Sequence, residues 1–270
     1  MFDRDIRRIG EKEGYSYLFS CMKDILLDTS IAVANLEGPI THNVTKSMGT
    51  KPGDIENMNF TFAPAITDAL LLNNIGYVNI GNNHILNFGK EGLVETKNYL
   101  TKAGIRYFGE PNLDNATNTN NVAHIKLAQR TIALVNYNQF WYPNATSTEN
   151  SIKQEKLVDN YVVIYAHWGE EYASSTSAQR ALAHGFIDSG ADFVTGSHPH
   201  VVQERELYKG KYIFYSLGNF IFDQWFSEDV MNGLAVRLTF QNSFDEPLVE
   251  ELPIKLMRDG RTCPVLTKRI

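Results

Sequence analysis

Short apolar runs that end in polar residues are the feature of this sequence that most restricts its fold. The run Tyr161-Val162-Val163-Ile164-Tyr165-Ala166 is apolar at every position. A strand has this composition when it lies inside a sheet whose two faces are both covered by helices. Similar runs at 31–36, 77–80 and 192–196 alternate with segments of helical pattern. This order predicts an α/β fold with buried strands.

Glycine and proline mark the ends of the expected helices. Pro64 is expected to open the first helix and Gly76 to close it. Two further helices are expected from about residue 90 to Gly104 and from about residue 175 to Gly190. Alternation over 122–137, with a turn at 128–130, predicts an antiparallel hairpin. Strands expected at 212–222, 234–240 and 249–257 make the sheet mixed.

Composition narrows the class of protein. The chain has 270 residues, 43% of them hydrophobic, which predicts a single domain over 1–270. The strand pattern places C-terminal strands of this domain over 241–270. The net charge of -6 provides no diffuse positive field, so nucleic acid is not an expected partner. No run approaches the roughly 18 apolar residues of a membrane helix. The first residues are too charged for a signal peptide, so we expect a soluble chain and leave its compartment open.

The two cysteines, Cys21 and Cys263, lie far apart in sequence, which excludes a cysteine zinc knuckle. Sequence alone does not decide whether they form a disulfide, because pairing depends on their geometry in the fold.

Polar residues at the ends of the expected strands are the candidate functional groups. They lie in the segments Asn35-Leu36-Glu37-Gly38, Asn82-Asn83-His84, His167-Trp168-Gly169 and Ser197-His198-Pro199-His200. In open α/β sheets, ligands bind at the carboxyl ends of strands. Imidazole, carboxylate and amide groups together suit Zn, Mn, Fe or Ni. Two such ions about 4 Å apart can share a hydroxide nucleophile, so the pattern indicates hydrolysis.

Simpler interpretations exist for several of these residues. The Asn82-Asn83 pair with Gly81 could be only a turn, and Glu37 could only cap the turn at Gly38-Pro39. The histidines could also do no more than hydrogen-bond to one another. Metal binding is favoured for four histidines because each directly follows an expected buried strand, where an unsatisfied polar group is costly. These are His84, His167, His198 and His200. The remaining histidines have surface patterns and are excluded: His42, His124 and His184.

Other catalytic patterns find less support. Ser197 beside His198 lacks the Gly-x-Ser-x-Gly turn of a serine hydrolase, and the chain has no Gly-x-x-x-x-Gly-Lys phosphate loop. Asn219, in Ser216-Leu217-Gly218-Asn219, could line a pocket or simply end a strand.

The strand-end segments, together with Tyr215-Ser216-Leu217-Gly218-Asn219-Phe220, resemble the CapA family of poly-γ-glutamate capsule biosynthesis proteins, within the metallo-dependent phosphatase superfamily. The motifs follow the family order over about residues 1–240. The resemblance implies a four-layer α/β/β/α sandwich with mixed sheets and a centre of one or two divalent ions, Mn, Fe or Zn. The metal ligands it implies are Glu37, Asn83, His167, His198 and His200.

The resemblance also implies roles around the metals. Glu37 would be the bridging carboxylate, and His84 would be the non-ligand histidine that protonates the leaving group. Asn35, Asn82 and Asn219 are candidates for substrate binding. Family members begin with a strand that ends in Gly-Asp and is followed by a Met and, shortly afterwards, an Arg. Met1-Phe2-Asp3-Arg4 resembles only the last part of that motif. The first strand and its aspartate are therefore expected to be missing, leaving one well-held metal, low activity and exposed sheet edges unless Asp3 or Asp5 takes that place.

Two functions follow from the resemblance. The first is a metal-dependent hydrolase that uses metal-bound hydroxide on a phosphoester or a γ-glutamyl amide bond. The second is a non-catalytic component of capsule assembly or export that binds an anionic polymer. Expected partners are the polymer or a small phosphoester, and capsule-synthesis membrane proteins. Family members are commonly associated with the cell surface.

Overall fold

The computed structural model describes residues 1–113, 120–128, 130–141, 144–241 and 246–265. The chain divides into two compact units. Unit 1 comprises Met1–Tyr107, Phe220–Met231 and Ile254–Ile270, and unit 2 comprises Phe108–Asn219 and Asn232–Pro253. The single domain expected over 1–270 stays a prediction.

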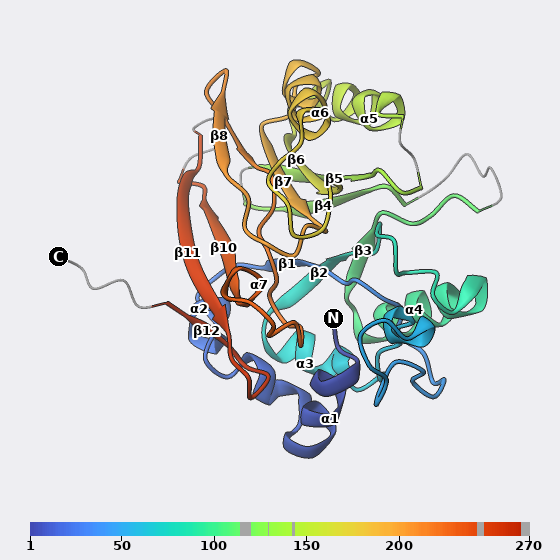
Figure 1. The fold of residues 1–270 in the computed structure, drawn as a ribbon. Coiled ribbons are helices and arrows are strands. Elements are labelled where there is room, and N and C mark those ends of the chain that lie inside the picture. The colour runs from blue at the N-terminus through green and yellow to red at the C-terminus, as the bar shows by residue number, and fades with distance from the viewer. Residues whose placement is uncertain (114–119, 129, 142–143, 242–245, 266–270) are drawn as a thin grey trace. The chain divides into compact units, whose positions relative to one another are not determined.

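Unit 1 is built on a sheet of order β1-β2-β3. Its strands are β1 (Ala32–Asn35), β2 (Ile75–Asn79) and β3 (Arg106–Phe108). β1 and β2 are parallel, with Asn35 opposite Asn79, so both strands end at the same edge. Helices α3 (Ile66–Leu72) and α4 (Gly89–Ala103) pack against each other beside this sheet (Figure 1). The two strands predicted around 31–36 and 77–80 are confirmed.

The ends of α3 and α4 test the prediction that a glycine closes each helix. α4 ends as predicted, because Gly104 caps it in the left-handed conformation at φ 78°. Gly76 does not close α3, since it lies inside β2. Asn74 takes that role with φ 60°, and its side chain donates to the carbonyl of Thr29 at 2.7 Å. Asparagine tolerates left-handed geometry, which is why the helix stops before the glycine.

The N-terminal part of unit 1 is helical. It contains α1 (Arg4–Glu13), η1 (Tyr15–Phe19) and α2 (Lys23–Leu27), and η2 (Ile55–Met58) follows β1. Buried Asp3 caps α1 and accepts hydrogen bonds from the Thr45 hydroxyl at 2.6 Å and the Thr61 amide at 2.7 Å. Asp5 is exposed and pairs with Arg8. Asp3 would have to break these contacts to bind a metal.

Unit 2 contains a mixed sheet of order β4-β5-β6-β7-β9-β8. Its strands are β4 (Val122–Lys126), β5 (Thr131–Asn138), β6 (Tyr161–His167), β7 (Phe193–Ser197), β8 (Arg205–Tyr208) and β9 (Lys211–Phe214). β5, β6, β7 and β9 are parallel, and β4 and β8 pair antiparallel at the edges. The interior position of β6 and the hairpin β4–β5 are confirmed, although Gln129 of its turn lies outside the described residues.

Helices α5 (Thr146–Lys156) and α6 (Ser177–Asp188) cover one face of this sheet (Figure 1). Ile152 of α5 and Phe186 of α6 join Val162, Ile164 and other sheet residues in one buried cluster. α6 begins with a capping box. The Thr176 hydroxyl accepts from the backbone amide of Gln179, and the Gln179 side-chain oxygen accepts from the backbone amide of Thr176. The predicted helix near 175–190 is confirmed.

The C-terminal part differs from the prediction of nearly continuous strand. The strand expected over 212–222 stops at Phe214, and α7 (Glu228–Met231) follows. β10 (Asn232–Thr239), β11 (Leu248–Leu256) and β12 (Thr262–Pro264) pair in the order β10-β11-β12, which confirms the last two predicted strands. Residues 242–245 and 266–270 lie outside the described residues. Among the helices that are described, none is long and apolar enough to span a membrane.

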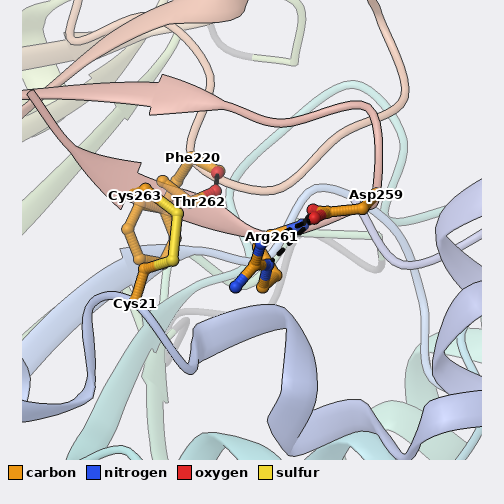
Figure 2. Close-up of a disulfide and its surroundings, with 6 residues drawn as sticks. All are labelled: Cys21, Phe220, Asp259, Arg261, Thr262 and Cys263. Carbon is orange, nitrogen blue, oxygen red and sulfur yellow. Dashed lines mark hydrogen bonds and ion pairs between the residues drawn. A yellow bond between two sulfur atoms is a disulfide. The ribbon is translucent and has the colours of Figure 1, made fainter.

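Cys21 and Cys263 form a disulfide in unit 1 (Figure 2). The bond joins the segment after η1 to β12, across a sequence separation of 242 residues. Beside it, the Thr262 hydroxyl donates to the carbonyl of Phe220, and Arg261 pairs with Asp259 at 2.7 Å (Figure 2). The disulfide thus fixes the C-terminal strand of unit 1 to its N-terminal segment.

We predict that the double substitution Cys21→Ser/Cys263→Ser lowers the free energy of unfolding by roughly 2–5 kcal/mol, because the cross-link restricts the unfolded chain. Thermal unfolding followed by circular dichroism, with and without reducing agent, measures this. Reducing agent should lower the melting temperature of the wild type and leave that of the double variant unchanged. A wild type that is insensitive to complete reduction would contradict the prediction.

Candidate metal centre

The polar residues at the strand ends of unit 1 form a chain of hydrogen bonds that ends on Glu37. The Asn82 amide donates to the carbonyl of Leu36 at 2.9 Å and to Asn35 Oδ1 at 3.2 Å. Asn35 Nδ2 in turn donates to Glu37 Oε2 at 3.0 Å. Glu37 is only 7% exposed, so these contacts hold a buried carboxylate in a defined orientation. Asn83, which follows Asn82, is half-buried.

His84 follows this network in the same unit and is also buried. Its backbone amide donates to Asn82 Oδ1 at 3.2 Å. Its ring lies edge-on to Phe60, with centroids 4.9 Å apart, and its Nδ1 is 3.2 Å from Asn87 Nδ2. The structure therefore gathers Asn35, Glu37, Asn82 and His84 at the carboxyl ends of β1 and β2.

Three buried histidines gather at the strand ends of unit 2. His167 ends β6 directly opposite Ser197, the last residue of β7, and its Nδ1 is 3.0 Å from the Ser197 hydroxyl. The His198 ring lies 5.0 Å from that of His167 and 6.0 Å from that of His200. His198 and His200 each offer a ring nitrogen, and these two nitrogens lie within 4.8 Å of each other. This arrangement is compatible with a site that holds a metal ion.

The backbone that carries these histidines is strained. His198 and His200 have φ angles of 96° and 60°, a region that L-residues rarely adopt. Tyr172, at φ 61°, donates its amide to the carbonyl of Pro199 at 2.8 Å. The loop after β6 thus holds the His198–His200 segment in place.

Asn219 contacts His200 at two points. Asn219 Oδ1 lies 2.9 Å from His200 Nδ1, and Asn219 Nδ2 donates to the His200 carbonyl at 3.2 Å. These contacts orient the His200 ring. The substrate-binding role expected of Asn35, Asn82 and Asn219 stays a prediction.

Two aromatic residues beside the histidines were not anticipated. The Phe140 ring lies 4.5 Å from that of His198, and the Tyr172 ring stacks on His200 at 6.0 Å. Phe140 is 43% exposed and Tyr172 46% exposed, so both rings also face solvent. Gln139, before Phe140, exchanges two hydrogen bonds with the backbone of Gly169, at 3.1 and 2.9 Å. No sequence pattern pointed to these contacts.

The histidines excluded on sequence grounds each pair with a glutamate. His42 contacts Glu95, His124 contacts Glu155, and His184 contacts Glu206. A hydrogen bond from the Tyr215 hydroxyl lowers the pKa of Glu206. Glu206 therefore stays ionised to lower pH than an ordinary glutamate, which suits an ion pair with His184.

Comparison with solved structures identifies the class of fold. A hypothetical protein from Thermus thermophilus matches 90% of the chain and 94% of its own, with a TM-score of 0.59 and 15% identity. A phosphatase from Mycoplasma pneumoniae matches 92% of the chain and 84% of its own, with a TM-score of 0.52 and 13% identity. The chain has a mixed α/β fold of the metallophosphatase kind, as predicted.

Sequence comparison identifies the family. The model of the bacterial capsule synthesis protein family PGA_cap matches residues 1–224, and the chain belongs to this family. Over 83% of its length it is 28% identical both to the PGA biosynthesis protein CapA of Bacillus subtilis and to the capsule biosynthesis protein CapA of Bacillus anthracis. The matches span only 61% and 58% of those two relatives.

Gly196 in β7 offers a test of how tightly the unit 2 strand ends are packed. A Cβ at this position would lie 2.0 Å from the Tyr215 carbonyl oxygen and 2.4 Å from Trp168 Nε1. We predict that Gly196→Ala lowers the free energy of unfolding by roughly 3 kcal/mol, because backbone must move. Chemical denaturation measures the change.

Gly185→Ala in α6 is the matched control, since its Cβ would meet only Glu149 Oε1 at 3.6 Å. This variant should be unchanged or more stable by up to about 1 kcal/mol, because alanine favours helix. Equal effects of the two substitutions would show that β7 is not tightly packed at Gly196.

Proposed function

We propose that this protein is a metal-dependent hydrolase of capsule biosynthesis that cleaves a phosphoester or a γ-glutamyl amide bond. The gathering of three buried histidines at the ends of β6 and β7 carries the proposal. Buried imidazoles at the carboxyl ends of parallel strands are suited to binding a ligand there.

The metal ligands in this proposal are Glu37, Asn83, His167, His198 and His200. Two or three imidazoles with a carboxylate and an amide oxygen favour Mn, Fe or Zn over Mg or Ca, which prefer all-oxygen sites. The orientation of Glu37 by Asn35 supports its part in such a set. When bound, a divalent ion would lower the pKa of water and stabilise negative charge on the attacked group.

The residues around the ions would orient the substrate and move protons. His84 in its protonated form would give a proton to the leaving group, a role suited to histidine because its ordinary pKa lies near neutrality. Phe140 and Tyr172, both half-exposed beside the histidines, would contact the part of the substrate next to the scissile bond.

A second candidate is a non-catalytic role in capsule assembly or export, with an anionic polymer or the synthesis machinery as partner. The names of the relatives favour it, because they refer to biosynthesis, and a Mycobacterium tuberculosis relative, 27% identical over 168 residues, is named a probable polyglutamine synthesis accessory protein. The acidic balance of the chain, 31 acidic against 25 basic residues, gives such a polymer no general attraction. We therefore favour the hydrolase.

For the hydrolase we predict distinct effects of two histidine substitutions. His198→Ala should lose bound metal and activity together, while His84→Gln should keep metal and lose about 10²- to 10⁴-fold in kcat. Metal content by plasma mass spectrometry and hydrolysis of an aryl phosphoester and a γ-glutamyl anilide test this. His124→Ala, at an exposed position, is the control and should match the wild type. Equal activity in all four proteins would refute the hydrolase.

The second candidate predicts that the protein binds poly-γ-glutamate and does not cleave it. Fluorescently labelled poly-γ-glutamate should then bind saturably and remain uncleaved in the presence of Mn²⁺ or Zn²⁺. Fluorescence anisotropy and gel analysis of polymer length measure the two properties. Absence of saturable binding would count against this candidate, and shortening of the polymer would support the hydrolase.

A further inference from the structure

We infer that Ser197, Asn219 and Asn87 fix the tautomers of three histidines, so that His167 and His200 present Nε2 as a lone pair while His84 carries its proton on Nε2. A neutral imidazole has one N–H and one acceptor nitrogen, and the partner of one nitrogen decides the state of the other. Each of the three assignments follows from contacts within one unit.

For His167, the deciding contact is that of Ser197. The Ser197 hydroxyl oxygen lies 3.1 Å from the carbonyl oxygen of Ala166 and 3.0 Å from His167 Nδ1. A carbonyl oxygen can only accept, so the single hydroxyl hydrogen points to Ala166. Ser197 then accepts from His167, which places the ring proton on Nδ1 and leaves the Nε2 lone pair for a ligand.

For His200, the deciding residue is Asn219. Its Nδ2 donates to the His200 carbonyl at 3.2 Å, and this fixes which way the amide points. The reversed amide would set two acceptor oxygens against each other. Asn219 Oδ1 therefore faces His200 Nδ1 at 2.9 Å and accepts its proton, so the lone pair again lies on Nε2.

His84 shows the opposite arrangement. Asn87 Nδ2 donates to the carbonyl of Met58 at 2.7 Å and lies 3.2 Å from His84 Nδ1. An amide nitrogen is only a donor, and its second hydrogen is directed to Nδ1. Nδ1 is therefore the acceptor, and the proton of neutral His84 lies on Nε2.

These tautomers separate the histidines by chemistry. An Nε2 lone pair suits His167 and His200 to metal binding, whereas an Nε2–H lets neutral His84 donate a hydrogen bond to an oxygen of the substrate. The step from tautomer to role rests on the proposed function, but the tautomers themselves belong to the metal-free protein. Ser197, Asn219 and Asn87 are thus positioning residues, since metal-binding histidines usually owe their orientation to such partners.

Long-range ¹H–¹⁵N correlation spectra of ¹⁵N-labelled, chelator-treated protein at about pH 8 test the inference, because histidines are mostly neutral there. Signals are assigned with single His→Gln variants. We expect the Nδ1–H pattern at His167 and His200, which a free imidazole disfavours, and the Nε2–H pattern at His84. The opposite pattern at His167 or His200 would overturn the inference.

Substitutions connect the tautomer to metal affinity. Ser197→Ala and Asn219→Leu should lose the Nδ1–H pattern of the neighbouring histidine and weaken Zn²⁺ or Mn²⁺ binding by about 10- to 100-fold in calorimetry. Ser197→Thr keeps the hydroxyl and should restore both. A wild type with the expected tautomers but no metal binding would refute the proposed hydrolase and leave the inference standing. Unchanged tautomers in both disruptive variants would refute the inference alone.

Discussion

The parallel register of β6 and β7 determines where the unit 2 histidines lie. His167 and Ser197 end the two strands opposite each other, and the chain continues from Ser197 directly into His198. Adjacent strands are about 4.8 Å apart, which lets the His167 ring reach the Ser197 hydroxyl. Below this point Gly196 leaves room for Trp168 Nε1 to donate to the Tyr215 carbonyl at 2.8 Å. A shift of one residue in this register would separate every one of these contacts.

The strained backbone after β7 depends on the same framework. Left-handed conformations at His198 and His200 cost of order 1–3 kcal/mol each and persist only where surrounding contacts enforce them. Those contacts come from Tyr172, which donates to Pro199, and from Asn219, which holds the His200 carbonyl. The two imidazoles are therefore oriented by the fold itself, and binding a ligand would require little further ordering of this segment.

The sequence predicted the strands and the residue types at their ends better than the contacts between them. An apolar run such as Tyr161–Ala166 indicates an interior strand on its own, because burial on both faces leaves no polar position. The prediction that Gly76 closes the helix was wrong, because the helix already ends before Asn74, which adopts the left-handed conformation. Asn87 is close in sequence to His84, but Ser197 lies far along the chain from His167. The roles of both partners depend on the carbonyls of Met58 and Ala166, which only the fold brings near them. Phe140 and Tyr172 had no sequence signal at all.

In both units, asparagine side chains donate one hydrogen bond and accept another, which an aspartate could not do. An amide donates on one side and accepts on the other, so Asn82 can donate to Asn35 while Asn35 donates to Glu37. Asn219 likewise donates to a carbonyl and accepts from His200 Nδ1. An aspartate at any of these positions could only accept, and it would add a buried charge next to the existing groups. Neutral amides therefore orient Glu37 and His200 and leave the local charge to the residues that would bind a cation.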